Sequence, residues 1–230
     1  TTPSGAYRGF GAPQTFFAVE MIMIHIARDL GIDDLKFREA HLVKQGDRTS
    51  TSGMYHFPIP LPDMIEEVDK ACDYRRKHEE YSKPQSGRYR KGIGISMHFH
   101  GAGFTGSGER DFIKAVVRLR KYKDGTVEIL ACNGEIGQGL RTTFPKIVAH
   151  ELNLPLNKVF YDHPDTSRVP DSGPTVASRS LMVVGELLRK AAIKLRSQWE
   201  DGKDQMVEER FVEPDFMIPF YIDKFQGDAY

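Results

Sequence analysis

The chain has 230 residues, and 32 basic residues balance 32 acidic ones. A balanced charge gives no electrostatic reason to expect a nucleic acid or an anionic membrane as partner. Hydrophobic residues make up 40% of the chain, enough for one large domain or two small ones, and no apolar run approaches the ~20 residues of a membrane span. Cys72 and Cys132 are the only cysteines, so we expect a cytoplasmic protein without a disulfide framework.

The N-terminal part of the chain is predicted to be helical. Apolar residues at helical spacing predict a helix over residues 14–30, after a loop punctuated by Gly and Pro. Asp33 can cap a short helix from residue 34 to about residue 42. A third helix is expected over residues 63–81, after a loop rich in Ser, Gly and Pro.

After Gly87 the predicted elements include strands. A strand is expected over residues 90–99, and Lys123-Asp124-Gly125 predicts the turn of a hairpin between strands at 112–121 and 126–131. Further elements are expected in the order helix, short strand, long helix and irregular tail, over residues 139–152, 159–161, 175–199 and 211–230.

The order of these elements predicts an α+β fold. A helical N-terminal region, residues 1–86, would precede a mixed β-sheet with packed helices, residues 87–230. We see no internal repeat that would divide the chain further.

Gly101 to Gly106 matches the pattern G-x-G-x-x-G and follows an expected strand. A dinucleotide site would also need a helix directly after these glycines, to hold the pyrophosphate at its N-terminus. A β-hairpin is expected there instead. A nucleotide-binding dehydrogenase domain is therefore a weak alternative, and a tight or flexible loop is favoured.

Two later segments offer polar groups where a helix is expected to begin. Residues 134–140 form a glycine-rich turn whose backbone N–H groups suit an anion such as phosphate, and Gln138 adds a donor and an acceptor. Residues 172–180 place several hydroxyls at the start of the long helix. A plain turn would explain the first segment equally well, whereas N-capping explains one hydroxyl of the second and not the cluster.

The opening loop, residues 6–14, combines an arginine and two aromatic residues with glycines, which suits a ligand loop as well as a simple lead into a helix. No set of residues predicts a metal bound directly by the protein. His98 and His100 share one face of the expected strand, but Cys72 and Cys132 have no ligand partner at short spacing.

Three of these segments, in this order, resemble motifs of the molybdenum hydroxylases, the family of xanthine dehydrogenase and aldehyde oxidase. Residues 7–14 are similar to the family's aromatic-Arg-Gly-Phe-Gly-Gly-Pro-Gln. Residues 135–140 resemble its Glu-Met-Gly-Gln-Gly-Leu, and residues 174–180 its Pro-Thr-Ala-Ala-Ser-x-Ser. The chain would then be a fragment of the molybdopterin-binding large subunit, truncated at both ends.

The resemblance implies a molybdopterin cofactor, often in its cytosine dinucleotide form, with molybdenum that has no direct protein ligand. The residues that would hold this cofactor are Tyr7, Arg8, Ile136, Gly137, Gln138, Ala177, Ser178 and Ser180. Phe10 would match a phenylalanine that packs on the substrate ring, and Met97 falls where the family has a second one. A methionine sulfur can still contact a ring there.

By the same resemblance, the intact enzyme would hydroxylate a purine, another N-heterocycle or an aldehyde with water as the oxygen source. Its electrons would leave through 2Fe-2S and FAD groups on partner subunits or on other parts of the chain. The family's catalytic glutamate stands in a Gly-x-Gly-Glu segment near the C-terminal end of the subunit. No residue of this chain is expected to be that base, so we expect the chain alone to be inactive. The alternative is a non-catalytic ligand-binding or interaction module of the same fold.

Overall fold

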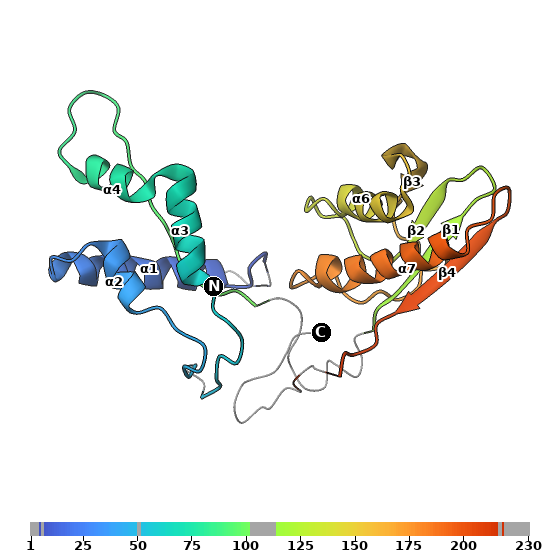
Figure 1. The fold of residues 1–230 in the computed structure, drawn as a ribbon, viewed down its shortest axis with the longest axis horizontal. Helices are drawn as coiled ribbons and strands as arrows, with labels where there is room; N and C mark the ends of the chain where they lie inside the picture. The colour runs from blue at the N-terminus through green and yellow to red at the C-terminus, as the bar shows by residue number, and fades with distance from the viewer. Residues whose placement is uncertain (1–4, 6, 50–51, 102–113, 216–217, 219–230) are drawn as a thin grey trace. The chain divides into compact units, whose positions relative to one another are not determined.

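The computed structural model of the chain describes residues 5, 7–49, 52–101, 114–215 and 218. It divides into two compact units, Thr1–His100 and Gly101–Tyr230 (Figure 1). Residues 87–100 thus fall in the first unit by their contacts, although the sequence groups them with the sheet. The domain boundary after residue 86 stays a prediction.

The first unit is built from helices, as predicted. They are α1 (Ala12–Asp29), α2 (Asp34–Ala40), α3 (Leu61–Cys72) and α4 (Tyr74–Ser82). The predicted cap of α2 is confirmed, because the Asp33 side chain accepts a hydrogen bond from Lys36 N at 3.0 Å. In the parts of the chain that the structure describes, no helix has the length and apolarity needed to cross a membrane.

The single helix expected over residues 63–81 is wrong, because Asp73 divides it into α3 and α4. Asp73 has a left-handed backbone, with φ of 57°. Aspartate is one of the few residues other than glycine that adopt this conformation readily. The bend lets Tyr74 pack with Leu35 and Ile65 in the small core of this unit. Tertiary packing therefore overrides the local helical pattern.

The strand expected over residues 90–99 is also wrong in part. The segment belongs to no sheet within the described residues. Its side chains nevertheless alternate between two faces, as those of a strand do, since Ile93, Ile95 and Met97 pack against the small core of the first unit. Alternation thus reports which side chains are buried, but not whether a second strand is present.

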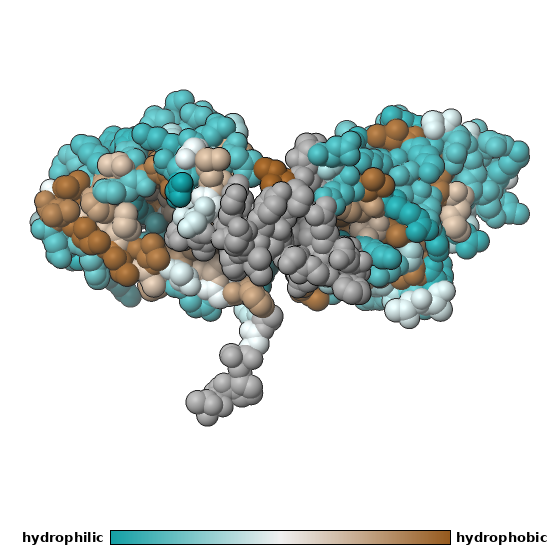
Figure 2. Space-filling model, turned by 90° about the horizontal axis from the view of Figure 1, so that it is seen from below, coloured by the Kyte–Doolittle hydropathy of each residue, from teal (hydrophilic) through white to brown (hydrophobic). Residues whose placement is uncertain are grey.

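Helix α1 buries little of its apolar surface within the described residues. Ala27 is its one buried residue there. Val19, Ile22 and Ile26 are spaced along the helix, Leu30 is its C-cap, and all four are exposed. Figure 2 shows hydrophobic residues, in brown, gathered on the surface of the first unit. The small core therefore gains little from this face of α1.

The second unit contains a sheet of order β3-β2-β1-β4 (Figure 1). Its strands are β1 (Val116–Lys121), β2 (Val127–Leu130), β3 (Val159–Phe160) and β4 (Gln205–Arg210). The predicted hairpin is confirmed, because β1 and β2 pair antiparallel, while β2 and β3 pair parallel. Strand β4 was not predicted. The sheet is mixed, as predicted.

Two helices cover one face of this sheet. Helix α7 (Gly185–Ser197) packs against β1 and β4, and α6 (Leu140–Leu152) packs against α7 and β3. Val117 and Leu119 point from β1 into the resulting core. A 3-10 turn (Leu156–Lys158) precedes β3. This core supports the loops that connect the strands to the helices.

The long helix predicted from residue 175 begins later, at Ser180. A π-helix (Ser180–Val184) leads into α7. Ala177 and Ser178 have positive φ angles of 50° and 60°. This left-handed backbone cannot be part of a right-handed helix, so residues 175–178 form a loop.

Candidate cofactor-binding site

The glycine-rich turn and the hydroxyl-rich loop of the second unit lie against each other. Gly134 N donates to Thr175 Oγ1 at 2.9 Å, and Asn133 Nδ2 donates to Ser180 Oγ at 3.1 Å. These bonds join segments that are more than forty residues apart in sequence. The structure therefore brings the loop of Gln138 next to the loop of Ser178.

Buried polar contacts fix the base of both loops. Cys132 N donates to Ser172 Oγ at 3.0 Å, and Ser172 N donates to Cys132 Sγ at 3.0 Å. The Ser172 hydroxyl also donates to Val116 O on β1 at 2.8 Å. Tyr161 donates its hydroxyl to Asn133 O, and burial raises its pKa above the usual value. The two loops are thus tied to each other and to the sheet.

Arg179 is a structural residue that the sequence analysis missed. Its side chain is almost fully buried, and its guanidinium donates to Ser172 O at 2.9 Å and to Pro174 O at 3.2 Å. Gly173 leaves room for this group, because a Cβ there would lie 2.5 Å from Arg179 Nη1 and 2.5 Å from Lys114 O. The guanidinium therefore holds the hydroxyl-rich loop from inside. An arginine among small polar residues was the one signal available.

Glu135 holds the glycine-rich turn and was also missed. Its carboxylate accepts hydrogen bonds from the N–H groups of Gly137 at 2.7 Å, Gly139 at 3.0 Å and Arg141 at 3.0 Å. The bonds from Arg141, Gly139 and Gly137 keep the pKa of the Glu135 carboxyl below its usual value. The anion at the start of α6 is therefore the protein's own carboxylate.

The Gln138 side chain lies within the same turn. Its Oε1 accepts from Ile136 N at 2.6 Å, and its Nε2 donates to Gly134 O at 2.7 Å. The side chain thus braces the turn rather than extending away from it. Ile136 is 80% exposed at the tip.

The tip of the hydroxyl-rich loop is strained and exposed. Ala177 and Ser178 are exposed, and both have the left-handed backbone described above. Asp73 and Asn153 share this conformation, but at helix ends, where it is common. Two consecutive residues of this kind in a loop cost on the order of 1 kcal/mol each, and such strain collects at functional sites. Ser180 is buried, so Ser178 offers the accessible hydroxyl.

The opening loop lies in the first unit. Tyr7, Arg8 and Phe10 are exposed, and Phe10 N donates to Tyr7 O at 2.7 Å. Phe10 has a φ of 51°, which is unusual for a bulky residue. Where this loop lies relative to the loops of the second unit stays a prediction, and with it the roles of Tyr7 and Arg8.

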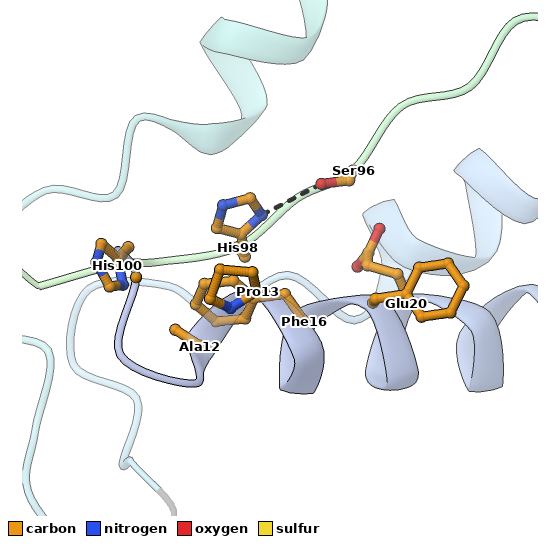
Figure 3. Close-up of a pocket in the computed structure, with 9 residues that line it drawn as sticks. Ala12, Pro13, Phe16, Glu20, Ser96, His98 and His100 are labelled. Carbon is orange, nitrogen blue, oxygen red and sulfur yellow. Dashed lines mark hydrogen bonds between the residues drawn. The ribbon is translucent and has the colours of Figure 1, made fainter. Parts of the chain in front are cut away.

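A pocket of about 430 Å³ lies beside the start of α1 (Figure 3). Its lining residues are Gly9, Ala12, Pro13, Phe16, Phe17, Glu20, Ser96, His98 and His100. His98 stacks on Phe16 with ring centroids 4.3 Å apart, and Ser96 Oγ lies 3.2 Å from His98 Nδ1. His98 and His100 thus share a face, as expected. Met97 points to the opposite side, and its substrate role stays a prediction, as does that of Phe10.

One group of possible metal ligands occurs among the described residues, and the sequence did not reveal it. Asp33, Asp34 and His78 each place one ligand atom within 4.8 Å of the others. His78 Nε2 lies 3.2 Å from Asp34 Oδ1, while Asp34 also pairs with Arg38 and Asp33 caps α2. These contacts describe a cluster of polar side chains between the start of α2 and α4.

Comparison with known proteins gives the family. Residues 67–216 match a family model described as "Molybdopterin cofactor-binding domain", and residues 1–42 match a second model of the same description. The chain therefore belongs to the molybdopterin cofactor-binding domain family. This family agrees with the resemblance that the motifs of the sequence showed.

The chain is similar to longer proteins. It is 31% identical over 196 residues to the xanthine dehydrogenase molybdenum-binding subunit of Escherichia coli O157:H7, which covers 85% of this chain and 26% of that protein. It is 32% identical over 194 residues to the aldehyde oxidoreductase of Megalodesulfovibrio gigas, covering 83% and 20% respectively. The chain thus spans about a quarter or less of the curated relatives it matches.

Solved structures share the fold. The aldehyde oxidoreductase of Desulfovibrio desulfuricans ATCC 27774 matches with a TM-score of 0.74 and 23% identity, over 98% of this chain and 26% of that one. Quinoline 2-oxidoreductase of Pseudomonas putida 86 matches with a TM-score of 0.62 and 22% identity, over 85% and 26%. At this level of identity the likeness supports the fold alone.

Proposed function

We propose that this chain supplies part of the cofactor site of an oxidoreductase of the xanthine dehydrogenase and aldehyde oxidase type. The enzyme would hydroxylate a purine, another N-heterocycle or an aldehyde, with water as the oxygen source. The observation that carries the proposal is the contact between the glycine-rich turn and the hydroxyl-rich loop through Gly134 and Thr175. Residues that the family would use for one cofactor thereby lie on neighbouring loops.

The residues of the two loops fit such a group. Gly137, Ala177 and Ser178 present exposed backbone, and Ser178 adds an exposed hydroxyl. Glu135 already occupies the N–H groups at the start of α6, so a phosphate there would meet a carboxylate. We therefore assign this turn to a neutral polar ring, such as a pterin, rather than to a phosphate.

When bound, the molybdopterin would supply the redox centre at which a substrate carbon is oxidised. The chain's own part is to bind and orient this group. The left-handed backbone of Ala177 and Ser178 gives the loop a defined shape, which suits a loop that orients a rigid group. The catalytic base is not assigned to any residue of this chain.

The finer features of the enzyme are part of the same proposal. The cofactor would be the cytosine dinucleotide form, as in relatives that the sequence resembles. Cys72 and Cys132 are both free thiols, which suits a cytoplasmic protein, and they are fewer than the four cysteines that hold a ferredoxin-type 2Fe-2S cluster. The 2Fe-2S and FAD groups would therefore lie on partner subunits or on other parts of the protein.

One observation favours the alternative, a non-catalytic binding or interaction module. Glu135 and Gln138 satisfy the glycine-rich turn internally, as a purely structural turn would. The third alternative, a dinucleotide loop after Gly101, lies outside the described residues.

Metal analysis of the intact enzyme separates these functions. We expect one molybdenum per chain and hydroxylation of at least one purine, N-heterocycle or aldehyde, with oxygen from labelled water in the product. Molybdenum-free enzyme, purified from cells that make the cofactor, would support the non-catalytic module instead. Product oxygen derived from O₂ would also contradict the proposal.

A further inference from the structure

The backbone of the segment Ile95–Met97 forms hydrogen bonds with two charged side chains instead of with a neighbouring strand. Arg38 Nη1 donates to Ile95 O at 2.7 Å. Glu20 Oε2 accepts from Met97 N at 3.3 Å. The segment belongs to no sheet in the described part of the chain, so these bonds to α1 and α2 are what fix its backbone.

Arg38 and Glu20 are also bound to each other. Arg38 is only 4% exposed, and its Nη1 donates to Glu20 Oε2 at 2.6 Å. Its remaining nitrogens donate to Asp34 O at 3.1 Å and to Asp34 Oδ2 at 3.0 Å. Because a buried charge without its partner is costly, neither side chain can leave alone. The pair therefore ties α1, α2 and the segment into one arrangement.

This arrangement decides which side chains face the pocket. Ser96 and His98 line it together with Glu20 (Figure 3). Ile95 and Met97 pack on the core side. In an extended segment, a shift of one residue exchanges the two faces. Such a shift would remove His98 from Phe16 and turn apolar side chains toward the pocket.

We propose that Glu20 and Arg38 are positioning residues that set the register of Ile95–His98 and thereby shape this pocket for a planar aromatic substrate. Phe16 and His98 both line the pocket, and aromatic side chains pair more favourably with a planar ring than with a flexible chain. The substrate part rests on the proposed function. The register part concerns this chain alone.

The register is tested by hydrogen exchange on the 230-residue chain. In Glu20→Ala we expect the Met97 amide to exchange about tenfold faster, which corresponds to the loss of one ordinary hydrogen bond. Amides within α7 should not change. Glu20→Gln keeps an acceptor oxygen and should restore most of the protection. Faster exchange throughout residues 7–100, or no change at Met97, would overturn the proposal.

Glu39→Gln is the matched control. Glu39 pairs with Arg75 at 2.7 Å in the same unit, whereas the bonds to Ile95 and Met97 come from Arg38 and Glu20. This variant removes an ion pair of α2 without touching the segment. It should leave the Met97 amide protected, and faster exchange there would show that any weakening of the unit has the same effect.

Substrate choice is tested in the intact enzyme with the same variants. We expect Glu20→Ala to raise KM about fivefold or more for a planar N-heterocycle, with kcat per molybdenum and the KM for a small aliphatic aldehyde little changed, because only the ring needs the aromatic side chains of the pocket in place. Equal losses for both substrates would mean that the pair stabilises the fold and nothing more. If the wild-type enzyme held no molybdenum, the proposed function would fail, and hydrogen exchange would still decide whether the pair sets the register.

Discussion

Asn133 and Ser180 are joined by their side chains, from Nδ2 to Oγ at 3.1 Å, although they stand 47 positions apart in the sequence. Asn133 is fully buried, and Ser180 begins the π-helix before α7. The bond therefore links the end of the central strands to the start of a helix, beneath the tips of both candidate cofactor loops.

We expect Asn133→Ala to lower the free energy of unfolding by about 1–3 kcal/mol, because it removes this bond and leaves a small cavity. Urea unfolding of the chain measures the change. Asn157→Ala is the control, since Asn157 is exposed in the 3-10 turn and should change stability by less than about 0.5 kcal/mol. Equal effects of the two substitutions would refute the structural role of Asn133.

Ser178→Gly should stabilise the chain and weaken the cofactor site. Glycine adopts the left-handed backbone of Ser178 without steric cost, so we expect a gain of about 1 kcal/mol in the cofactor-free chain. The same change removes the exposed hydroxyl, and the molybdenum content of the intact enzyme should fall. Ser197→Gly, at the end of α7, should instead destabilise by about 0.5–1 kcal/mol. Destabilisation by both glycines would argue against strain at Ser178.

Gln138→Ala tests whether the glycine-rich turn serves the cofactor. In the intact enzyme we expect molybdenum content or turnover to fall by roughly one to two orders of magnitude, because two hydrogen bonds of about 0.5–1.5 kcal/mol each hold the shape of the turn. The loss would act through the turn, because Gln138 holds Ile136 N and Gly134 O. Folding should survive, with a change of about 1 kcal/mol. Normal molybdenum content and turnover would identify Gln138 as a structural turn residue only.

Glu135 should make the turn sensitive to acid. Hydrogen bonds from Arg141, Gly139 and Gly137 lower the pKa of Glu135 in the folded chain, so its ionised form stabilises the fold above the unfolded pKa, near 4.5. This stabilisation is lost as the pH falls below about 4.5 and through the lowered folded pKa. Wild type should therefore exceed Glu135→Gln in stability at about pH 7, and the difference should shrink at about pH 3.5. Urea unfolding at both pH values measures it, and a difference that grows in acid would contradict the assignment.

Local signals were sufficient for part of the fold. The apolar spacing of α1, the Asp33 cap of α2 and the Asp-Gly turn between β1 and β2 are each encoded within a few residues. Strand β4 could not be predicted from the sequence, because Val207 is its one buried residue and Glu208 pairs with Arg118 on the neighbouring strand at 2.7 Å. The sequence of such a charged edge strand resembles that of an exposed loop until its pairing partner is known.

The candidate site was predictable in its motifs but not in its contacts. The resemblance placed Gln138 and Ser178 in one site, and the structure shows that their loops touch. Glu135 and Arg179 were missed because their roles depend on where backbone N–H and C=O groups point. Residue type and spacing carry no information on those directions.

The number of residues in the π-helix Ser180–Val184 determines the direction in which the hydroxyl-rich loop points. An α-helix turns by about 100° per residue, so removing one residue here to make a regular helix would rotate the preceding loop by that angle about the axis of α7. The apolar face of α7 is fixed by its packing on β1 and β4, so the rotation would fall on Ala177 and Ser178. Substitutions within the π-helix would leave the direction of the loop unchanged, whereas a deletion would turn its exposed tip, Ala177 and Ser178, away from the glycine-rich turn.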